Sequence, residues 1–315
     1  SDCDGNTKAF AKRLAANDKE TRDLTLLALK KWIVAQCRNQ NKNANKNKSK
    51  EILSDMEMLK LWKGLFYCMW MSDKTPIQHE LAQNISDLIF VFDSKSKKEL
   101  GWAQFIKGFF ITMQREWLGI DHLRLDKYYT FIRKIIHAWL KFLCKRGWDN
   151  NDLALYKTVM VDTVLTNKPD GLRFHVLDVF LPELEKVCKS NSKSVDFNNL
   201  QDILAPFYIL LAGIKSQTLY EYALKKVFYA LPEFSATTSV DVDVNITIVS
   251  KCIFKIASES ETLPSKQRDL LYDTYKHLKS VAKKGKEATG KDMVPEKFTT
   301  ESTQDDKEPK KKEKK

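Results

Sequence analysis

Apolar side chains recur at helical spacing along most of the chain. After Thr21, leucine, tryptophan and isoleucine residues follow one another three or four positions apart as far as Ala35. This spacing gathers them on one face of an α-helix. The same period returns between short polar stretches and predicts about ten or eleven helices, near residues 21–36, 55–70, 76–92, 100–117, 121–146, 149–165, 169–188, 195–214, 216–231, 245–257 and 264–284. Only 10 Gly and 8 Pro occur in 315 residues, which favours an all-α protein over a turn-rich β or dinucleotide-binding fold.

One segment reads in two ways. From Val240 to Val249 apolar and polar residues alternate, as in a β-strand, yet Ile246, Val249 and Ile253 also fit a helix. A single strand would have no partner in an otherwise helical chain. The helical interpretation, beginning near Asn245, is therefore favoured.

The spacing of the segments suggests an architecture. Successive helix pairs occupy roughly forty residues each, the unit length of HEAT and armadillo repeats. We expect an irregular HEAT/armadillo-like α-solenoid over residues 1–284, with Pro182 and Pro206 as kinks or breaks. The repeats do not align clearly with one another, so an irregular helical bundle is the alternative. Residues 285–315 are polar and Lys-rich and are predicted to be a disordered tail.

Positive charge is concentrated in two polar segments. The chain has 53 Lys and Arg against 41 Asp and Glu, a formal net charge of +12, which points to a polyanionic partner such as RNA. A predicted flexible loop from 38 to 50 has five positive charges and no acid, and it could contact phosphates without reading sequence; its cations are Arg38, Lys42, Lys46, Lys48 and Lys50. The Lys-rich tail is the second such segment and could also serve nuclear import.

The long helix near 121–146 carries a possible nucleic-acid edge. With 100° between successive residues, five cations fall in one sector away from the apolar face; they are Arg124, Lys127, Lys134, Lys141 and Lys145. Such a row could follow a phosphate backbone. A solvated helix face whose lysine stems cover the core explains the same pattern equally well. The seven tryptophans recur among Leu, Ile and Phe, which favours core packing over base stacking.

The chain lacks the common signatures of catalysis. Its five histidines are far apart, and no zinc-protease, hydrolase, P-loop or dinucleotide motif occurs. The acids Glu116, Asp121 and Asp126 alternate with basic residues, which favours helix caps and salt bridges over a magnesium or acid-base site. No cofactor, metal or small-molecule substrate is expected.

Cysteine usage and hydropathy bear on the compartment. The six cysteines are scattered, without a CxxC pair, and are read as reduced thiols of an intracellular protein. The longest uncharged apolar run is too short to cross a membrane, and the polar start of the chain is unlike a secretory signal.

Two long segments carry a family resemblance. Residues 61–74, LWKGLFYCMWMSDK, and residues 115–129, REWLGIDHLRLDKYY, closely resemble signature segments of the ribosomal RNA processing protein 1 family, also called the nucleolar Nop52 family. Weaker similarity extends from Phe10 to the last predicted helix. The chain lacks the long acidic insertion of animal members, which would fall near 234–240, and its basic tail is shorter.

The resemblance implies a non-enzymatic assembly factor of the large (60S) ribosomal subunit. Such a protein acts in the nucleolus, inside the nucleus, within early pre-60S particles, and is needed for processing of precursor ribosomal RNA beside other assembly factors. We expect a helical scaffold that docks these partners and holds precursor RNA. Within the signature segments Lys63, Lys74, Arg115, Arg124 and Lys127 are the residues expected to reach a partner.

Two other functional classes remain open at this point. A pure protein-protein adaptor without RNA contact is the main alternative, and salt-dependent RNA binding would separate it from the first. A ribonuclease or methyltransferase is the third class, with no nucleotide loop and no clear acid cluster to support it.

Overall fold

The chain folds into thirteen α-helices within the part that the structure describes. This part of the computed structural model comprises residues 2–42, 53–93, 101–165, 169–190, 195–237 and 245–289. The helices are α1 (Asp2–Leu14), α2 (Lys19–Lys42), α3 (Asp55–Trp70), α4 (Thr75–Ser86), α5 (Gly101–Glu116), α6 (His122–Lys145), α7 (Asn150–Met160), α8 (Asp170–Ser190), α9 (Phe197–Gly213), α10 (Gln217–Ala223), α11 (Leu231–Thr237), α12 (Ile246–Glu259) and α13 (Ser265–Thr289). Two short 3₁₀ helices, η1 (Asp87–Phe92) and η2 (Trp117–Gly119), and two π-helical turns, η3 (Val161–Leu165) and η4 (Leu224–Phe228), extend their neighbours.

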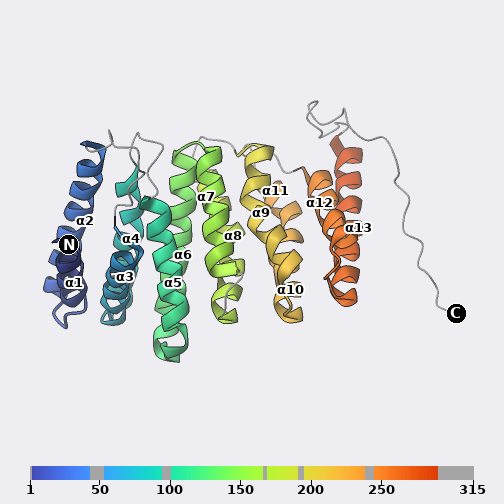
Figure 1. Cartoon of the computed structure of the whole chain (residues 1–315). Helices are drawn as coiled ribbons and strands as arrows, with labels where there is room; N and C mark the ends of the chain where they lie inside the picture. The colour runs from blue at the N-terminus through green and yellow to red at the C-terminus, as the bar shows by residue number, and fades with distance from the viewer. Residues whose placement is uncertain are drawn as a thin grey trace.

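The helices stand side by side in a row, from α1 and α2 at one end to α12 and α13 at the other (Figure 1). Contacts link alternate helices: α1 packs on α3, α3 on α5, α5 on α7, α7 on α9 and α9 on α12. We call these helices with η3 the first layer. The second layer comprises α2, α4, η1, α6, α8, α10, η4 and α13, of which α4 packs on α6, α6 on α8, α8 on α10 and α10 on α13. This alternation is that of a solenoid of stacked antiparallel pairs, so the predicted all-α solenoid is confirmed.

Side-chain caps fix several helix starts. Ser54 and Glu57 form a reciprocal capping box at α3, while Asp121, Asp149, Asp196 and Ser216 accept a hydrogen bond from the first turns of α6, α7, α9 and α10. These oxygens satisfy backbone N–H groups that have no partner within the helix. At the other end of α6, Gly147 adopts a φ of 78°, which explains the stop predicted there.

Several element predictions need correction. The helix α1 is absent from the predicted set, because its segment lacks a long apolar stripe. The short helix α11 is also additional and begins where the predicted helix 216–231 ends. The helix α2 extends to Lys42, so the first residues of the predicted loop 38–50 are helical; the remainder, 43–50, lies outside the described residues. Pro182 and Pro206 lie inside α8 and α9 without ending them.

The two C-terminal predictions have different outcomes. Asn245 caps α12, and its side chain accepts a hydrogen bond from Ile248 N at 3.2 Å, so the helical interpretation is confirmed for residues 245–249. The last helix, α13, reaches Thr289, five residues past the predicted boundary at 284. Residues 290–315, which include most of the predicted tail, lie outside the described part.

Aromatic side chains form much of the core in the N-terminal half. Trp62 of α3 packs on Phe105 and Phe109 of α5, with ring centroids 4.5 and 5.1 Å apart. Its indole Nε1 donates to Phe105 O at 2.7 Å, which satisfies the polar atom of a fully buried ring. Trp102, Trp139 and Trp148 are also at most 2% exposed, so these tryptophans belong to the core as predicted. None of the described helices has the combination of length and apolar character needed to span a bilayer.

Candidate interaction surfaces

The two signature segments meet where α3 ends against α6. Lys127 of α6 donates from Nζ to the backbone oxygens of Trp70, at 2.7 Å, and Ser72, at 2.8 Å. The residue is only 6% exposed, and burial lowers the pKa of its ammonium group to about 8. The C-terminal carbonyls of a helix lack intrahelical donors and carry partial negative charge, so they offset part of the cost of burying this cation.

A second buried cation approaches the same end of α3. Arg22 of α2 donates to the carbonyl oxygens of Ala16 and Asn17, at 2.9 and 2.7 Å, and makes a longer contact of 3.4 Å to Met71 O. It thereby ties the α1–α2 turn to the end of α3. The α3–α6 junction, which we define as Arg22, Trp70, Met71, Ser72 and Lys127, is held by cations on backbone carbonyls.

Aromatic contacts complete this junction. Tyr128 stacks on Phe66 with centroids 4.7 Å apart and donates from its hydroxyl to Phe66 O at 3.0 Å. The guanidinium of Arg124 lies 4.5 Å from the centroid of the Trp70 ring, a cation–π contact, and also pairs with Asp121, the cap of α6. Several residues of the two signature segments therefore serve to pack these segments against each other.

The predicted basic edge of α6 divides into an engaged and an open part. Lys127 is buried, Arg124 is half-buried in its contacts with Asp121 and Trp70, and Lys145 forms a 2.6 Å ion pair with Asp93. Lys134 and Lys141 have no ion-pair partner among the described residues, and Lys141 is exposed. The five cations are thus not one continuous free ladder, because Lys127 contacts the end of α3 near the start of α6 and Lys145 pairs with Asp93, just after η1, at its end.

The other predicted contact residues are dispersed. Lys63 on α3, Lys74 before α4, Arg115 on α5 and Arg38 on α2 are all exposed, but they lie on different elements. Lys42 belongs to the last turn of α2. The remaining predicted residues, Lys46, Lys48 and Lys50, fall outside the described part of the chain.

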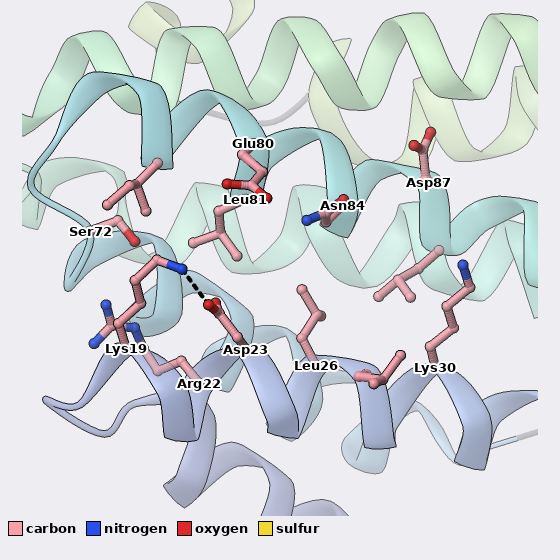
Figure 2. A pocket seen from close by; sticks show the side chains of 13 residues that line it. Lys19, Arg22, Asp23, Leu26, Lys30, Ser72, Glu80, Leu81, Asn84 and Asp87 are labelled. Atoms are coloured by element: carbon pink, nitrogen blue, oxygen red, sulfur yellow. Dashed lines mark hydrogen bonds and ion pairs between the residues drawn. The ribbon is translucent and has the colours of Figure 1, made fainter.

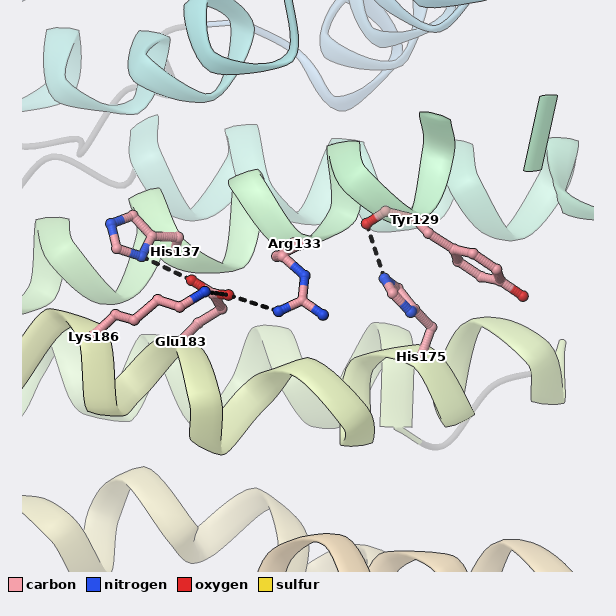
Figure 3. A network of polar contacts seen from close by, with 6 residues as sticks. All are labelled: Tyr129, Arg133, His137, His175, Glu183 and Lys186. Carbon is pink, nitrogen blue, oxygen red and sulfur yellow. Dashed lines mark hydrogen bonds and ion pairs between the residues drawn. The ribbon is translucent and has the colours of Figure 1, made fainter. Parts of the chain in front are cut away.

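A buried carboxylate joins α6 to α8 (Figure 3). Glu183 of α8 accepts hydrogen bonds from Arg133 and His137 of α6, both at 3.0 Å, and from Lys186 of its own helix at 2.7 Å. Burial of the Glu183 side chain raises its pKa, but the hydrogen bonds from His137, Lys186 and Arg133 outweigh this effect and hold the pKa at about 2. We call these four residues the α6–α8 junction.

One further histidine belongs to the same helix pair. His175 Nε2 donates to Tyr129 O at 2.9 Å, and the two rings lie 4.3 Å apart (Figure 3). Burial lowers the pKa of His175 despite this hydrogen bond, which favours the neutral ring. The described residues contain no group of three or more His, Cys, Asp and Glu that could hold a metal ion, and Asp121 serves as a cap, as the structural interpretation of the acids expected.

Comparison with known proteins gives the chain its family. A family profile described as "Nucleolar protein, Nop52" matches residues 5–315. The chain belongs to the Nop52 family. The resemblance inferred from the two signature segments is therefore confirmed.

Individual relatives of this Nop52 chain carry a consistent name. It is 35% identical over 229 residues to human ribosomal RNA processing protein 1 homolog B, covering 72% of this chain and 28% of the relative. Homolog A of Mus musculus is 34% identical over 236 residues, covering 74% and 44%, and the Caenorhabditis elegans homolog is 29% identical over 283 residues, covering 85% and 66%. The chain thus spans less than half the length of these two mammalian relatives.

Side-chain charge is distributed unequally between the two layers of the Nop52 fold. The second-layer helices contain 24 Lys and Arg against 13 Asp and Glu, whereas the first-layer helices contain 10 against 9. The excess is concentrated on α2, α6 and α13. Apart from segments between helices, one layer therefore presents a basic surface and the other is close to neutral.

The sequence analysis did not identify the structural roles of the residues that hold the two junctions, and it assigned Lys127 to a partner-binding edge. Two of these residues nevertheless leave a signal in the sequence. Lys127 precedes Phe131 and Ile135 at steps of four, and Glu183 lies between Val179 and Val187 at the same spacing. A charged residue on an apolar stripe is expected to be buried and therefore paired. Arg22 has no comparable signal, because its partners are carbonyl groups in loops brought together by the fold.

Proposed function

We propose that this chain acts in the processing of precursor ribosomal RNA, as a nucleolar scaffold for assembly of the large (60S) ribosomal subunit. The names of its relatives and of its family support the part of this proposal that concerns ribosomal RNA processing. The scaffold role is supported by the solenoid, whose long faces offer separate surfaces to several partners. In this proposal other proteins of the particle catalyse the processing reactions, and the chain itself works without catalysis or a cofactor.

Contact with RNA is placed on the second layer. The observation that carries this step is the charge difference between the layers, because phosphate binding depends on cations that release counterions. Lys134 and Lys141 on α6 and Lys276 on α13 lack ion-pair partners in the described part of the chain. They are therefore available for phosphate contacts, whereas Arg124, Lys127 and Lys145 are engaged in the fold.

A salt titration tests this assignment. A variant with Lys134→Glu, Lys141→Glu and Lys276→Glu is compared with a first-layer variant, Lys63→Glu, Arg115→Glu and Lys157→Glu, which changes net charge equally. Binding of a labelled precursor-rRNA transcript is measured by fluorescence anisotropy at several salt concentrations. We expect the second-layer variant to lose affinity and to reduce the slope of log K against log salt by about 2, from roughly 0.7 per lost contact on single-stranded RNA.

Two results would contradict the RNA assignment. Equal losses in both variants would mean that net charge alone matters, without a role for the layer. Absence of salt-dependent RNA binding by the unmodified chain would favour the adaptor alternative, particularly if all three proteins still co-sediment with pre-60S particles.

A further inference from the structure

The second layer opens between its first two members. Elsewhere in the layer neighbouring helices pack directly, but α2 meets the next pair chiefly through η1. The bodies of α2 and α4 enclose a groove with a cavity of about 330 Å³ (Figure 2). We call this the α2–α4 groove. Its α2 wall runs from Lys19 to Lys30, which at 1.5 Å per residue is about 17 Å, or three helical turns.

The floor of the α2–α4 groove is apolar. Leu26 of α2 and Leu81 and Leu88 of the opposite wall line it and are buried. Leu27 also lines it and is 52% exposed. The buried leucines are already out of water, so a partner gains chiefly by covering Leu27.

The walls carry opposite charges that do not pair across the groove. Lys19 and Lys30 lie on the α2 side and Glu80 and Asp87 on the other, as Figure 2 shows. Lys19 instead pairs with Asp23 of its own helix, and Asp87 accepts from Gln83 at 2.9 Å. Lys30 and Glu80 form no ion pair among the described residues. The charge of Glu80 acts on Lys19 across the groove, after the larger effect of Asp23, but without a salt bridge, so Lys30 and Glu80 can each pair with an occupant.

This combination selects the class of occupant. A phosphate backbone would be repelled by Glu80 and Asp87 and would gain nothing from a leucine floor. An amphipathic helix matches the length of the groove, its apolar floor and its oppositely charged walls. Its apolar stripe at i, i+3/i+4 and i+7 spans two to three turns, and its flanks can carry charge of either sign. The floor residues Leu26, Leu81 and Leu88 are already packed in place, so the groove needs little reorganisation on binding.

We propose that the α2–α4 groove binds an amphipathic helix of a partner protein, with leucine-like side chains on the floor, carboxylates toward Lys30 and basic residues toward Glu80. This inference rests on the scaffold role proposed above and gives it a specific docking site. It places the protein partner and the RNA on the same layer but on different helices, since the open cations of α6 and α13 lie outside the groove.

Three designed peptides of about 15 residues test the proposal. All share one leucine stripe; the first has glutamate on one flank and lysine on the other, the second has glutamate on both flanks and the third lysine on both. Fluorescence anisotropy with the full chain measures their affinities. We expect the mixed-flank peptide to bind at least about tenfold more tightly than the other two, because it alone complements both walls.

Variants of exposed residues localise the binding. Leu27→Asp should abolish binding of the mixed-flank peptide, whereas Leu24→Asp should not, since Leu24 is similarly exposed (55%) on α2 but does not line the groove. Glu80→Lys with Asn84→Lys should shift the preference about tenfold toward the all-glutamate peptide. Thermal unfolding of each variant verifies that the fold is retained.

The outcomes are separable from those of the RNA experiment. Equal affinity for the three peptides, or equal losses for Leu27→Asp and Leu24→Asp, would overturn the groove proposal while salt-dependent RNA binding could persist. Loss of RNA binding in Leu27→Asp would also overturn it, because the groove would then serve RNA. Peptide selectivity in a chain that binds no RNA would leave the groove in place and remove the RNA assignment.

Discussion

The α3–α6 and α6–α8 junctions solve the same problem with opposite chemistry. Each buries a charged side chain between neighbouring elements of the stack. At the α3–α6 junction the buried charges are cations, Lys127 and Arg22, and their partners are backbone carbonyls. At the α6–α8 junction the buried charge is the carboxylate of Glu183, and its partners are side chains that reach the surface.

The difference decides how each junction responds to pH and mutation. Carbonyl dipoles compensate only part of a buried ammonium, so the pKa of Lys127 falls. Two cationic side chains and a histidine overcompensate one carboxylate, so the pKa of Glu183 falls as well. A lowered pKa means that the charged form of a lysine is disfavoured, whereas the charged form of a glutamate is favoured. The two junctions therefore contribute to stability in different pH ranges.

The largest effect is expected from Glu183→Gln. The amide keeps the shape but loses the charge that attracts Arg133, His137 and Lys186, so we expect a loss of about 2–3 kcal/mol in the free energy of unfolding at pH 7. Urea denaturation measures it. Because the folded pKa is about 2 and the ordinary value 4.5, the stabilisation is complete above pH 4.5 and is lost as pH falls toward 2. The difference between the two proteins should shrink accordingly.

A surface pair on the same helix gives the control. Glu185 accepts from Lys189 near the end of α8 and is partly exposed, so Glu185→Gln should change stability by less than about 0.5 kcal/mol. If both variants lose the same amount, or if the loss at Glu183 does not depend on pH, the buried carboxylate does not act as described.

A smaller loss, about 1–2 kcal/mol at pH 7, is expected from Lys127→Met. The thioether side chain leaves Trp70 O without its donor, while Ser72 O keeps a hydrogen bond from Gln78 at 2.9 Å. Removing the buried charge offsets part of this loss. Lys134→Met on the same helix lacks these contacts and serves as the matched control.

The pH dependence of Lys127→Met has the same direction as that at Glu183 but falls in an alkaline window. The folded lysine releases its proton near pH 8 and the unfolded one near 10.5. The unmodified chain therefore gains stability relative to the variant as pH rises through this window, by up to about 1.4 kcal/mol per pH unit. Denaturation curves at pH 7, 8.5 and 10 measure the gain, and a constant difference would show that Lys127 is not desolvated.

The sequence predicted the helices better than the contacts between them. Periodicity and caps are local, so segments such as α6, from its cap Asp121 to the stop at Gly147, could be located from neighbouring residues alone. Helical geometry alone groups the cations of α6 on one edge. Which of these cations are engaged in contacts is decided by Asp93 and the end of α3, which lie far away in sequence. Likewise, the α2–α4 groove exists because α2 meets the next pair chiefly through η1 rather than along α4, a property of packing that no local pattern records.

The smallest effect concerns the side of α3 away from its polar junction. Gly64 lies where α1 crosses α3, and an added Cβ would come 2.6 Å from Ala11 Cα. Alanine ordinarily stabilises a helix by about 0.5–1 kcal/mol relative to glycine, yet here it must push α1 away, and we expect Gly64→Ala to destabilise by about 1 kcal/mol. Gly5→Ala on α1, where nothing lies within 4 Å, should show the ordinary gain. Thermal unfolding of the two variants gives the sign of each change in stability. A gain in stability for Gly64→Ala would mean that α1 can shift without cost. In that case α3 is held in the stack by its cationic junction rather than by contact with α1.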